Sequence, residues 1–157
     1  MIRVATSGGF DPLHIGHIRL FKEAKKLGDK LIVILNTDDF LLRKKGFVFM
    51  SQDERKEVIE GIKWVDEVVL SIDRDQTVCK TLEMLKPDIF AKGGEWTPVN
   101  LPEKEVCDRL GIKIVYGLVG NVQSSTKLAL EVVEKINKLD RKRWLKLKQL
   151  LHRGQEL

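Results

Sequence analysis

Residues 2–17 read IRVATSGGFDPLHIGH, and this stretch decides the fold class. Its first part is rich in β-branched side chains, which predicts a strand over residues 2–7. The glycines Gly8 and Gly9 then let the backbone turn. Apolar residues at helical spacing follow and predict a helix over residues 15–27. A strand that leads directly into a helix is the first half of a βαβ unit.

The same alternation continues along the chain. Residues 30–35 read KLIVIL, a continuous apolar run that is typical of a parallel strand covered on both faces. The capping box at residues 51–54 predicts a helix that runs to about Gly61, after a loop over residues 43–46 that is rich in lysine and glycine. The remaining predicted elements are strands over residues 67–71, 89–92 and 112–116 and helices over residues 77–86, 102–110 and from Ser124 or Ser125 onward. The pattern predicts an α/β fold, a Rossmann-like doubly wound five-stranded parallel sheet.

Length and composition fit a single domain followed by a tail. The chain has 157 residues, of which 43% are apolar and 32% are charged, so it can bury a core without disulfides or structural metals. The two cysteines form no CxxC pair, which argues against a disulfide framework and against a cysteine-based zinc site. The sequence contains no apolar run of about 18 residues and no recognisable signal peptide, so we expect a cytoplasmic protein.

The positive charge lies in the tail. Residues 137–157 contain seven Lys or Arg and two acidic residues, which accounts for the whole net charge of +5. Residues 1–136 are neutral overall, and we expect no nucleic-acid partner for them. This division predicts a domain over residues 1–136 and a basic helical tail over residues 137–157.

Polar residues and glycines follow the predicted strands at the points where the strands end. In a parallel sheet the carboxyl ends of the strands meet at one edge, and ligands bind outside that edge. The segments concerned are Ser7-Gly8-Gly9-Phe10-Asp11, Asn36-Thr37-Asp38, Lys92-Gly93-Gly94 and Val122 to Lys127. We therefore expect the functional site at this edge.

His14 and His17 lie three residues apart at the start of a predicted helix, so their side chains share one face. A helix N-terminus offers unpaired N–H groups and a positive dipole end. Two imidazoles there can donate hydrogen bonds to oxygens that gain charge when a phosphorus–oxygen bond breaks. The pattern also fits an ordinary turn or a partial metal site. A zinc site needs a third ligand and the only other histidine is His152, so we expect an oligophosphate and no protein-held metal.

The string GGFDPLHIGH, with a strand before it and a helix after it, resembles the HxGH signature of the cytidylyltransferase-like nucleotidyltransferase superfamily. The resemblance implies that His14 and His17 stabilise the triphosphate during nucleotidyl transfer. It also implies that the preceding turn binds the nucleotide phosphates. The residues of that turn are Gly8, Gly9, Phe10 and Asp11.

The resemblance extends to about residue 136 and is closest to the branch of heptose-1-phosphate adenylyltransferases and glycerol-3-phosphate cytidylyltransferase. It implies acceptor contacts from Asp38 and Arg55, and contacts to the β- and γ-phosphates from Lys44. It also implies nucleotide contacts from Lys92, Gly93, Gly94, Ser124, Ser125 and Thr126. Simpler roles stay open: Lys44 as a solvated surface lysine, Arg55 in a surface ion pair, and the hydroxyl run as helix caps.

The implied reaction is in-line attack by a sugar 1-phosphate oxygen on the α-phosphorus of a nucleoside triphosphate, with loss of pyrophosphate. Mg²⁺ would bind through the phosphates. The Lys-Gly-Gly match favours ATP. The alternative is a CTP-dependent enzyme acting on glycerol 3-phosphate or another polyol phosphate. An FAD synthase-type adenylyltransferase and a non-catalytic nucleotide-binding protein fit the sequence less well.

The tail has apolar residues near one helical face and basic residues mostly elsewhere. Such a helix fits docking on its own domain or on the partner in a homodimer, which we expect here. It also fits contact with an anionic membrane surface or with nucleic acid.

Overall fold

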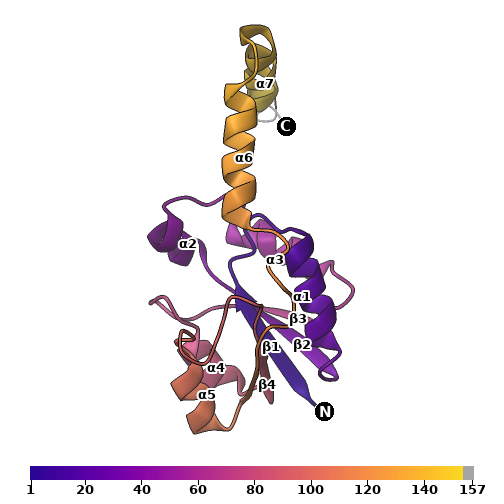
Figure 1. The fold of residues 1–157 in the computed structure, drawn as a ribbon, viewed down its shortest axis with the longest axis vertical. Helices are drawn as coiled ribbons and strands as arrows, with labels where there is room; N and C mark the ends of the chain where they lie inside the picture. The colour runs from indigo at the N-terminus through magenta and orange to yellow at the C-terminus, as the bar shows by residue number, and fades with distance from the viewer. Residues whose placement is uncertain (154–157) are drawn as a thin grey trace. The chain divides into compact units, whose positions relative to one another are not determined.

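The structure is a computed structural model that describes residues 1–153, so residues 154–157 of the predicted tail lie outside the described residues. Its strands are β1 (Arg3–Gly8), β2 (Lys30–Leu35), β3 (Glu67–Leu70), β4 (Ile89–Ala91) and β5 (Lys113–Val115) (Figure 1). Its helices are α1 (Ile15–Lys25), α2 (Asp38–Lys45), α3 (Gln52–Glu60), α4 (Cys79–Leu85), α5 (Lys104–Leu110), α6 (Ser125–Asn137) and α7 (Arg141–Arg153).

The five strands form one parallel sheet in the order β3-β2-β1-β4-β5. The chain winds outward from β1 twice, first through β2 and β3 and then, on the other side, through β4 and β5. This arrangement confirms the predicted doubly wound fold. The winding reverses between β1 and β4, and in such sheets a ligand crevice opens at this point, outside the carboxyl ends of the strands.

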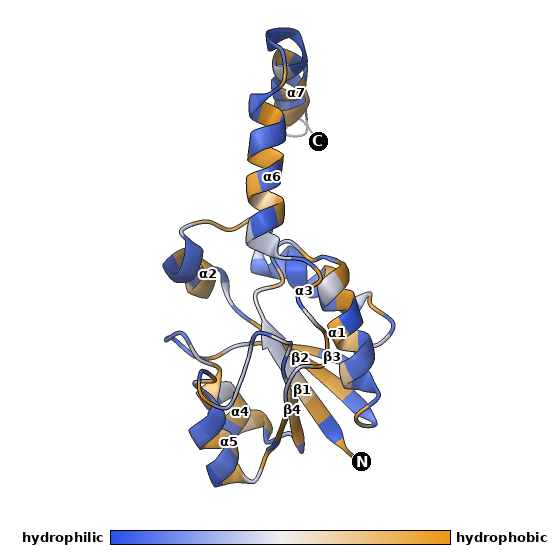
Figure 2. Ribbon diagram, in the orientation of Figure 1, coloured by the Kyte–Doolittle hydropathy of each residue, from blue (hydrophilic) through white to orange (hydrophobic). Residues whose placement is uncertain are grey.

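The strands consist mainly of apolar residues, as their colouring in Figure 2 shows, and two apolar clusters contain their side chains. Leu31, Val33 and Leu35 of β2 pack in a cluster that also contains residues of α1 and α3. Ile34, on the opposite face, packs in a cluster with residues of α4 and α5. Because β2 is buried on both faces, its sequence is apolar at consecutive positions rather than at alternate ones.

Helix α2 is an element that the sequence interpretation missed. Thr37 Oγ1 accepts a hydrogen bond from the Phe40 N–H (3.3 Å) and begins the helix. Gly46 ends it in the left-handed conformation, with φ of 84°. The predicted loop over residues 43–46 was therefore wrong, because residues 43–45 form the last helical turn. Lys44 projects from a helix, not from a loop.

The other strands and helices predicted up to the start of α6 are confirmed, with ends that shift by at most two residues. The strand over residues 30–35 matches at both ends. The capping box at α3 is also present: Ser51 Oγ accepts from the Glu54 N–H (3.3 Å), and the Glu54 carboxylate accepts from the Ser51 N–H (3.2 Å).

The chain divides into two compact units, Met1–Ser125 and a second unit that begins at Thr126. The first unit holds the sheet and helices α1 to α5, and the second holds most of α6 and all of α7. The unit boundary falls inside the predicted domain over residues 1–136. Within residues 1–153, no helix combines the length and apolar character that a membrane span requires.

Candidate active site

The segments that follow β1, β2 and β4 meet at the carboxyl edge of the sheet, as the sequence predicted. Lys92, directly after β4, donates a hydrogen bond from Nζ to the Ser7 hydroxyl of β1 (3.1 Å). Arg55 of α3 donates to the carbonyl oxygens of Gly9 (2.7 Å) and Asn36 (2.8 Å), which follow β1 and β2. The contact between Lys92 and Ser7 spans the reversal point of the sheet, and the contacts of Arg55 join the neighbouring segments after β1 and β2.

The turn after β1 contains a strained residue. Phe10 has φ of 50°, a left-handed conformation that costs a non-glycine residue about 1–3 kcal/mol. Its ring is buried and packs edge-on against the rings of His17 (centroids 4.9 Å apart) and Phe21 (5.0 Å). Packing of this ring therefore holds the turn in a conformation that the backbone alone disfavours.

The glycines of the turn are explained by packing. A Cβ atom on Gly8 would lie 2.8 Å from the Phe10 ring, and one on Gly9 would lie 2.6 Å from the Leu41 side chain of α2. A Cβ atom on Gly16 would lie 2.9 Å from the His14 ring. Side chains of the protein occupy the space in which a Cβ atom would lie at these positions. Glycine is therefore needed there so that these side chains can pack against the backbone of the turn.

His14 and His17 are oriented by the backbone of the first helical turn. His14 Nδ1 accepts from the Gly16 N–H (3.1 Å), and His17 Nδ1 accepts from the His14 N–H (3.3 Å). The two rings stack with their centroids 3.6 Å apart. A neutral imidazole has one donor and one acceptor nitrogen, so Nε2 carries the proton in both rings. Each ring therefore keeps Nε2–H as its donor.

Burial keeps both histidines neutral. It lowers the pKa of His14. It also lowers the pKa of His17 to about 3, with a second contribution from the neighbouring His14 charge. At pH 7 both rings are therefore uncharged donors, and an anion brought to them would favour their protonation.

Asp11 braces the turn. Its side chain is fully buried, and its carboxylate accepts from the Phe49 and Met50 N–H groups (2.7 Å each) and lies 3.2 Å from Lys45 Nζ. The resemblance implied that Asp11 binds nucleotide. In the structure its carboxylate oxygens are engaged by the segment that leads into α3, so Asp11 fixes the turn through protein contacts.

Arg55 is a second brace. Its side chain is 0% exposed and donates to the carbonyl oxygens of Met50, Gly9 and Asn36 and to the Asp38 carboxylate (2.7 Å). The resemblance implied an acceptor contact for Arg55, and the simpler alternative was a surface ion pair. The ion pair with Asp38 is present, but the guanidinium is enclosed, and it joins three backbone segments: the turn after β1, the residues after β2 and the residues before α3. Asp38, at the start of α2, remains partly exposed.

Lys92 is a buried cation. Its ammonium group lies 4.7 Å from the Trp96 ring centroid and 5.1 Å from the Phe90 ring centroid, and it donates to one hydroxyl, that of Ser7. The pKa of Lys92 is lowered to about 8, chiefly by burial; the charges of Glu103 and Glu95 oppose this shift, and the positive charge of Lys44 contributes to it. Lys92 is therefore a buried amine whose charge depends on nearby groups of both signs.

The remaining predicted residues differ in their surroundings. Lys44 is exposed on α2, with Nζ 5.8 Å from the Phe40 ring centroid. Gly93 has open space at its Cβ position, whereas a Cβ atom on Gly94 would lie 2.8 Å from the Val119 carbonyl oxygen. Gly94 therefore packs against the segment that follows β5.

The hydroxyl run at the start of α6 is divided. Ser125 Oγ donates to the Pro12 carbonyl oxygen (2.9 Å), which ties the end of the first unit to the turn after β1. Ser124 is exposed, and Thr126 belongs to the second unit. The structure therefore brings Ser125 to the turn after β1 through a protein contact.

The sequence predicted no specific contact for two residues of the site. Lys45 also donates to the Asp11 carbonyl oxygen (2.6 Å), and Gln52 accepts from the Asp38 N–H (3.0 Å). The contacts of Lys45 and Gln52 have no local sequence signal, because the partners lie 34 and 14 residues apart.

Asn36 Oδ1 is a buried acceptor without a protein partner among residues 1–153.

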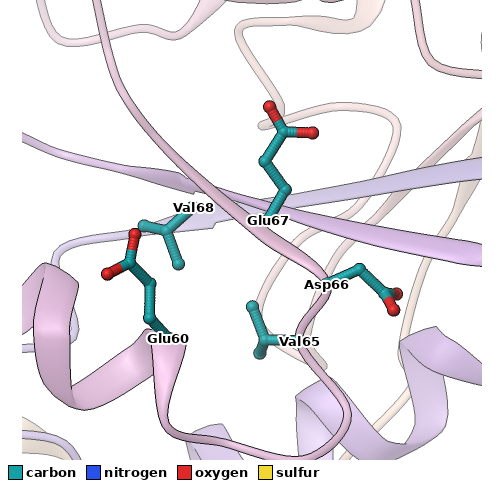
Figure 3. A pocket seen from close by; sticks show the side chains of 5 residues that line it. All are labelled: Glu60, Val65, Asp66, Glu67 and Val68. Atoms are coloured by element: carbon teal, nitrogen blue, oxygen red, sulfur yellow. The ribbon is translucent and has the colours of Figure 1, made fainter.

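A separate pocket lies at the amino end of β3 and is lined by Glu60, Val65, Asp66, Glu67 and Val68 (Figure 3). Its acidic side chains are paired with lysines: Asp66 with Lys25, Glu67 with Lys30 and Glu60 with Lys56. Among residues 1–153, no cluster of His, Cys, Asp or Glu could hold a metal ion. The pocket therefore lacks free carboxylates and lies away from the carboxyl edge.

Comparisons with known proteins agree on one family. Residues 5–142 match the family described as cytidylyltransferase-like. The FAD synthase of Aciduliprofundum boonei is 33% identical over 88% of this chain and 95% of its own length. The glycerol-3-phosphate cytidylyltransferase of Bacillus subtilis is 34% identical over 84% of this chain and 98% of its own length. The bifunctional protein HldE of Syntrophotalea carbinolica is 31% identical over 84% of this chain, which spans 27% of HldE.

A solved structure shares the fold. The crystal structure of the lipopolysaccharide core biosynthesis protein from Thermoplasma volcanium matches with a TM-score of 0.62 and 35% identity. The match covers 74% of this chain and 95% of that protein.

Proposed function

Because this chain belongs to the cytidylyltransferase-like family and is a nucleotidyltransferase, we propose that it transfers AMP from ATP to the phosphate of a phosphorylated sugar. The observation that carries this proposal is the pair formed by His14 and His17. Two neutral rings stack at a helix N-terminus, each with Nδ1 occupied by a backbone N–H and with Nε2–H as its donor. This arrangement suits the oxygens of a triphosphate.

The reaction needs no protein nucleophile. An oxygen of the acceptor phosphate attacks the α-phosphorus and forms a new phosphorus–oxygen bond. The bond from the α-phosphorus to the bridging oxygen breaks, and pyrophosphate leaves with the electron pair. His14 and His17 donate hydrogen bonds to oxygens that gain charge, and Lys92 and Lys44 supply positive potential. The contribution of the protein is therefore positioning and charge stabilisation.

The residues of the site fit a magnesium ion held mainly by the nucleotide. The carboxylate of Asp11 is engaged by two N–H groups and by Lys45. Mg²⁺ binds readily through phosphate oxygens and water with few protein ligands, and when bound it neutralises charge on the triphosphate.

ATP as the donor has two independent supports. The segment Lys92-Gly93-Gly94 resembles that of heptose-1-phosphate adenylyltransferases. FAD contains an AMP moiety, and archaeal FAD synthases align with this chain over more than nine-tenths of their own length. The same alignments support FMN as a second candidate acceptor.

CTP with glycerol 3-phosphate is the other candidate pair. It is supported by the Bacillus subtilis relative, which aligns over 98% of its length. The relatives therefore agree on nucleotidyl transfer as the reaction but differ in their substrates. The experiment below tests which substrate pair this chain uses.

The test is pyrophosphate release with Mg²⁺ over a grid of substrates. ATP, CTP, GTP and UTP are each combined with a set of sugar 1-phosphates, glycerol 3-phosphate and FMN. We expect turnover with ATP and a sugar 1-phosphate. Turnover only with ATP and FMN, or only with CTP and a polyol phosphate, would replace the proposed substrates by the corresponding alternative. Nucleotide binding without turnover across the grid would contradict the proposal.

The histidine pair offers a matched control. Asn keeps an N–H donor but cannot take up a proton, so His17→Asn is expected to lower kcat by about 10²-fold or more. His152→Asn changes the exposed histidine of α7 and should leave kcat within about twofold. A His17→Asn variant that folds and keeps normal kcat would remove the central role of this residue.

A further inference from the structure

Helix α7 carries an exposed apolar face that the proposed reaction does not use. The helix reads RKRWLKLKQLLHR, and every one of its residues is exposed. Trp144, Leu147, Leu150 and Leu151 follow one another at intervals of three, three and one, which places them on one side of a helix. Leu145 lies on the opposite side. The helix is therefore amphipathic, and its apolar side chains are 42–70% exposed.

The charge of α7 is of one sign. Residues 141–153 include six Lys or Arg and no Asp or Glu. Helix α6 differs, because its two lysines are balanced by two glutamates, Glu131 and Glu134. The basic character of the tail is thus concentrated in the element whose apolar side chains are exposed.

The exposed apolar side chains and the positive charge of α7 together favour one kind of binding partner. Two copies of α7 packed against each other would bring twelve positive charges together, which opposes self-association of this helix. Nucleic acid would satisfy the charges but would give the three leucines no apolar environment. An anionic bilayer surface satisfies both, because its headgroups attract Lys and Arg while the acyl boundary accepts Leu and Trp.

We propose that α7 binds the surface of an anionic lipid bilayer and lies in the plane of the interface. A helix of 13 residues is about 20 Å long, and isolated helices of this length are only marginally stable in water. Insertion of Trp144 and the leucines would stabilise the helix on the membrane. The binding is that of a peripheral protein, since the helix does not meet the requirements for a span.

The experiment is sedimentation of the full chain with lipid vesicles. Vesicles of phosphatidylcholine alone are compared with vesicles that contain about 30% phosphatidylglycerol, an anionic lipid. The chain is expected to bind the anionic vesicles about tenfold or more tightly than the neutral ones. We expect binding to the anionic vesicles and release by added salt. Equal binding to both vesicles, or no binding to either, would overturn the proposal.

Two leucines form a matched pair for this test. Leu147 lies on the apolar side and is 42% exposed, and Leu145 lies on the polar side and is 48% exposed. Leu147→Gln should weaken vesicle binding about tenfold or more, because a leucine no longer enters the interface. Leu145→Gln should leave binding within about twofold. Replacing Lys142 and Lys146 together by Gln should weaken binding about 25-fold, at about fivefold per charge.

Competing occupants give different results. A dimer that Leu147→Gln dissociates, in a chain that binds no vesicles, would assign the face to a second copy and overturn the proposal. Duplex DNA binding that is unaffected by Leu147→Gln, again without vesicle binding, would assign it to nucleic acid and overturn the proposal. Sedimentation does not depend on catalysis, so its outcome is independent of the proposed function.

Discussion

Burial sets the charge of the basic groups at the carboxyl edge of the sheet. It lowers the pKa of His14 and His17 so that both are neutral at pH 7. It lowers the pKa of Lys92 to about 8, so that this amine is close to losing its proton. An anion that enters the site favours the charged form of all three groups. Ligand binding is therefore expected to be coupled to proton uptake.

Lys92 gives the first prediction at the residue scale. Its pKa is about 8 in the folded state and near 10.5 when unfolded, so the unfolded state binds more protons between these pH values. The contribution of Lys92 to stability is therefore lowest below pH 8 and rises as pH increases to about 10.5. Lys92→Met should raise the free energy of unfolding at pH 7 by about 1–2 kcal/mol and remove this pH dependence.

The same substitution should have the opposite effect on function. ATP affinity of the wild-type protein should fall as pH rises past 8, since the ammonium group loses its charge. Lys92→Met should bind ATP weakly at every pH. Thermal unfolding and calorimetric titration from pH 7 to 9.5 provide both readouts. Equal pH dependence of ATP affinity in the two proteins would exclude an electrostatic role for Lys92.

Arg55 gives the second prediction. Its guanidinium satisfies three backbone carbonyl groups and pairs with Asp38, and its side chain is 0% exposed. Lysine has a single ammonium group and cannot reproduce the fork, so Arg55→Lys should lower the free energy of unfolding by about 2–4 kcal/mol. Asp38→Asn keeps a hydrogen-bond acceptor at a partly exposed position and should cost about 1 kcal/mol. Urea unfolding compares the two, and similar losses would mean that the ion pair, not the backbone contacts, carries the stability.

Residues with local signals could be predicted, and residues with distant partners could not. His14 and His17 are recognisable from their spacing at a helix start, and the structure places them at the N-terminus of α1. The burial of Asp11 and Arg55 depends on partners 38–39 and 19–46 residues away. A charged residue at a predicted helix start is ordinarily exposed, so only the tertiary arrangement reveals that Arg55 is enclosed.

At the scale of elements, periodicity identified the strands and failed for α2. Helix α2 has only eight residues, and its apolar positions are too few to form a helical stripe. Its end signals were nevertheless present in the sequence. Thr37 precedes it, Asp38 and Asp39 occupy its first turn, three basic residues occupy its last turn, and Gly46 follows. Capping and charge signals therefore define a short helix better than periodicity does.

Glycine packing between elements supplies a prediction at this scale. A Cβ atom on Gly28, between α1 and β2, would lie 2.7 Å from the Ile2 carbonyl oxygen and 2.8 Å from the Val4 side chain. Backbone cannot move aside as a side chain end can, so Gly28→Ala should lower the free energy of unfolding by about 2 kcal/mol or more. Gly93→Ala has open space and should change stability by less than about 0.5 kcal/mol. Chemical unfolding of both variants checks the comparison, and equal stabilities would refute the packing argument.

At the scale of the whole molecule, the division of the chain into two units yields the last prediction. The predicted catalytic groups His14, His17 and Lys44 lie in the unit Met1–Ser125, whereas α7 lies in the other. A chain that ends at Asp140 should therefore keep its kcat for pyrophosphate release within about twofold and its melting temperature within a few degrees. Loss of more than about tenfold in kcat would show that the tail contributes to the site.

The buried braces also have a consequence for how such an enzyme diversifies. Asp11 and Arg55 hold the turn after β1 from inside the protein, so changing either alone removes support from several backbone groups at once. Gly93, by contrast, borders open space. Substitutions can accumulate at such open positions while the interior stays unchanged, which allows substrate preference to change among descendants that keep one reaction. Selection for a new substrate would thus change residues at open positions. Selection for the transfer chemistry would preserve the buried residues.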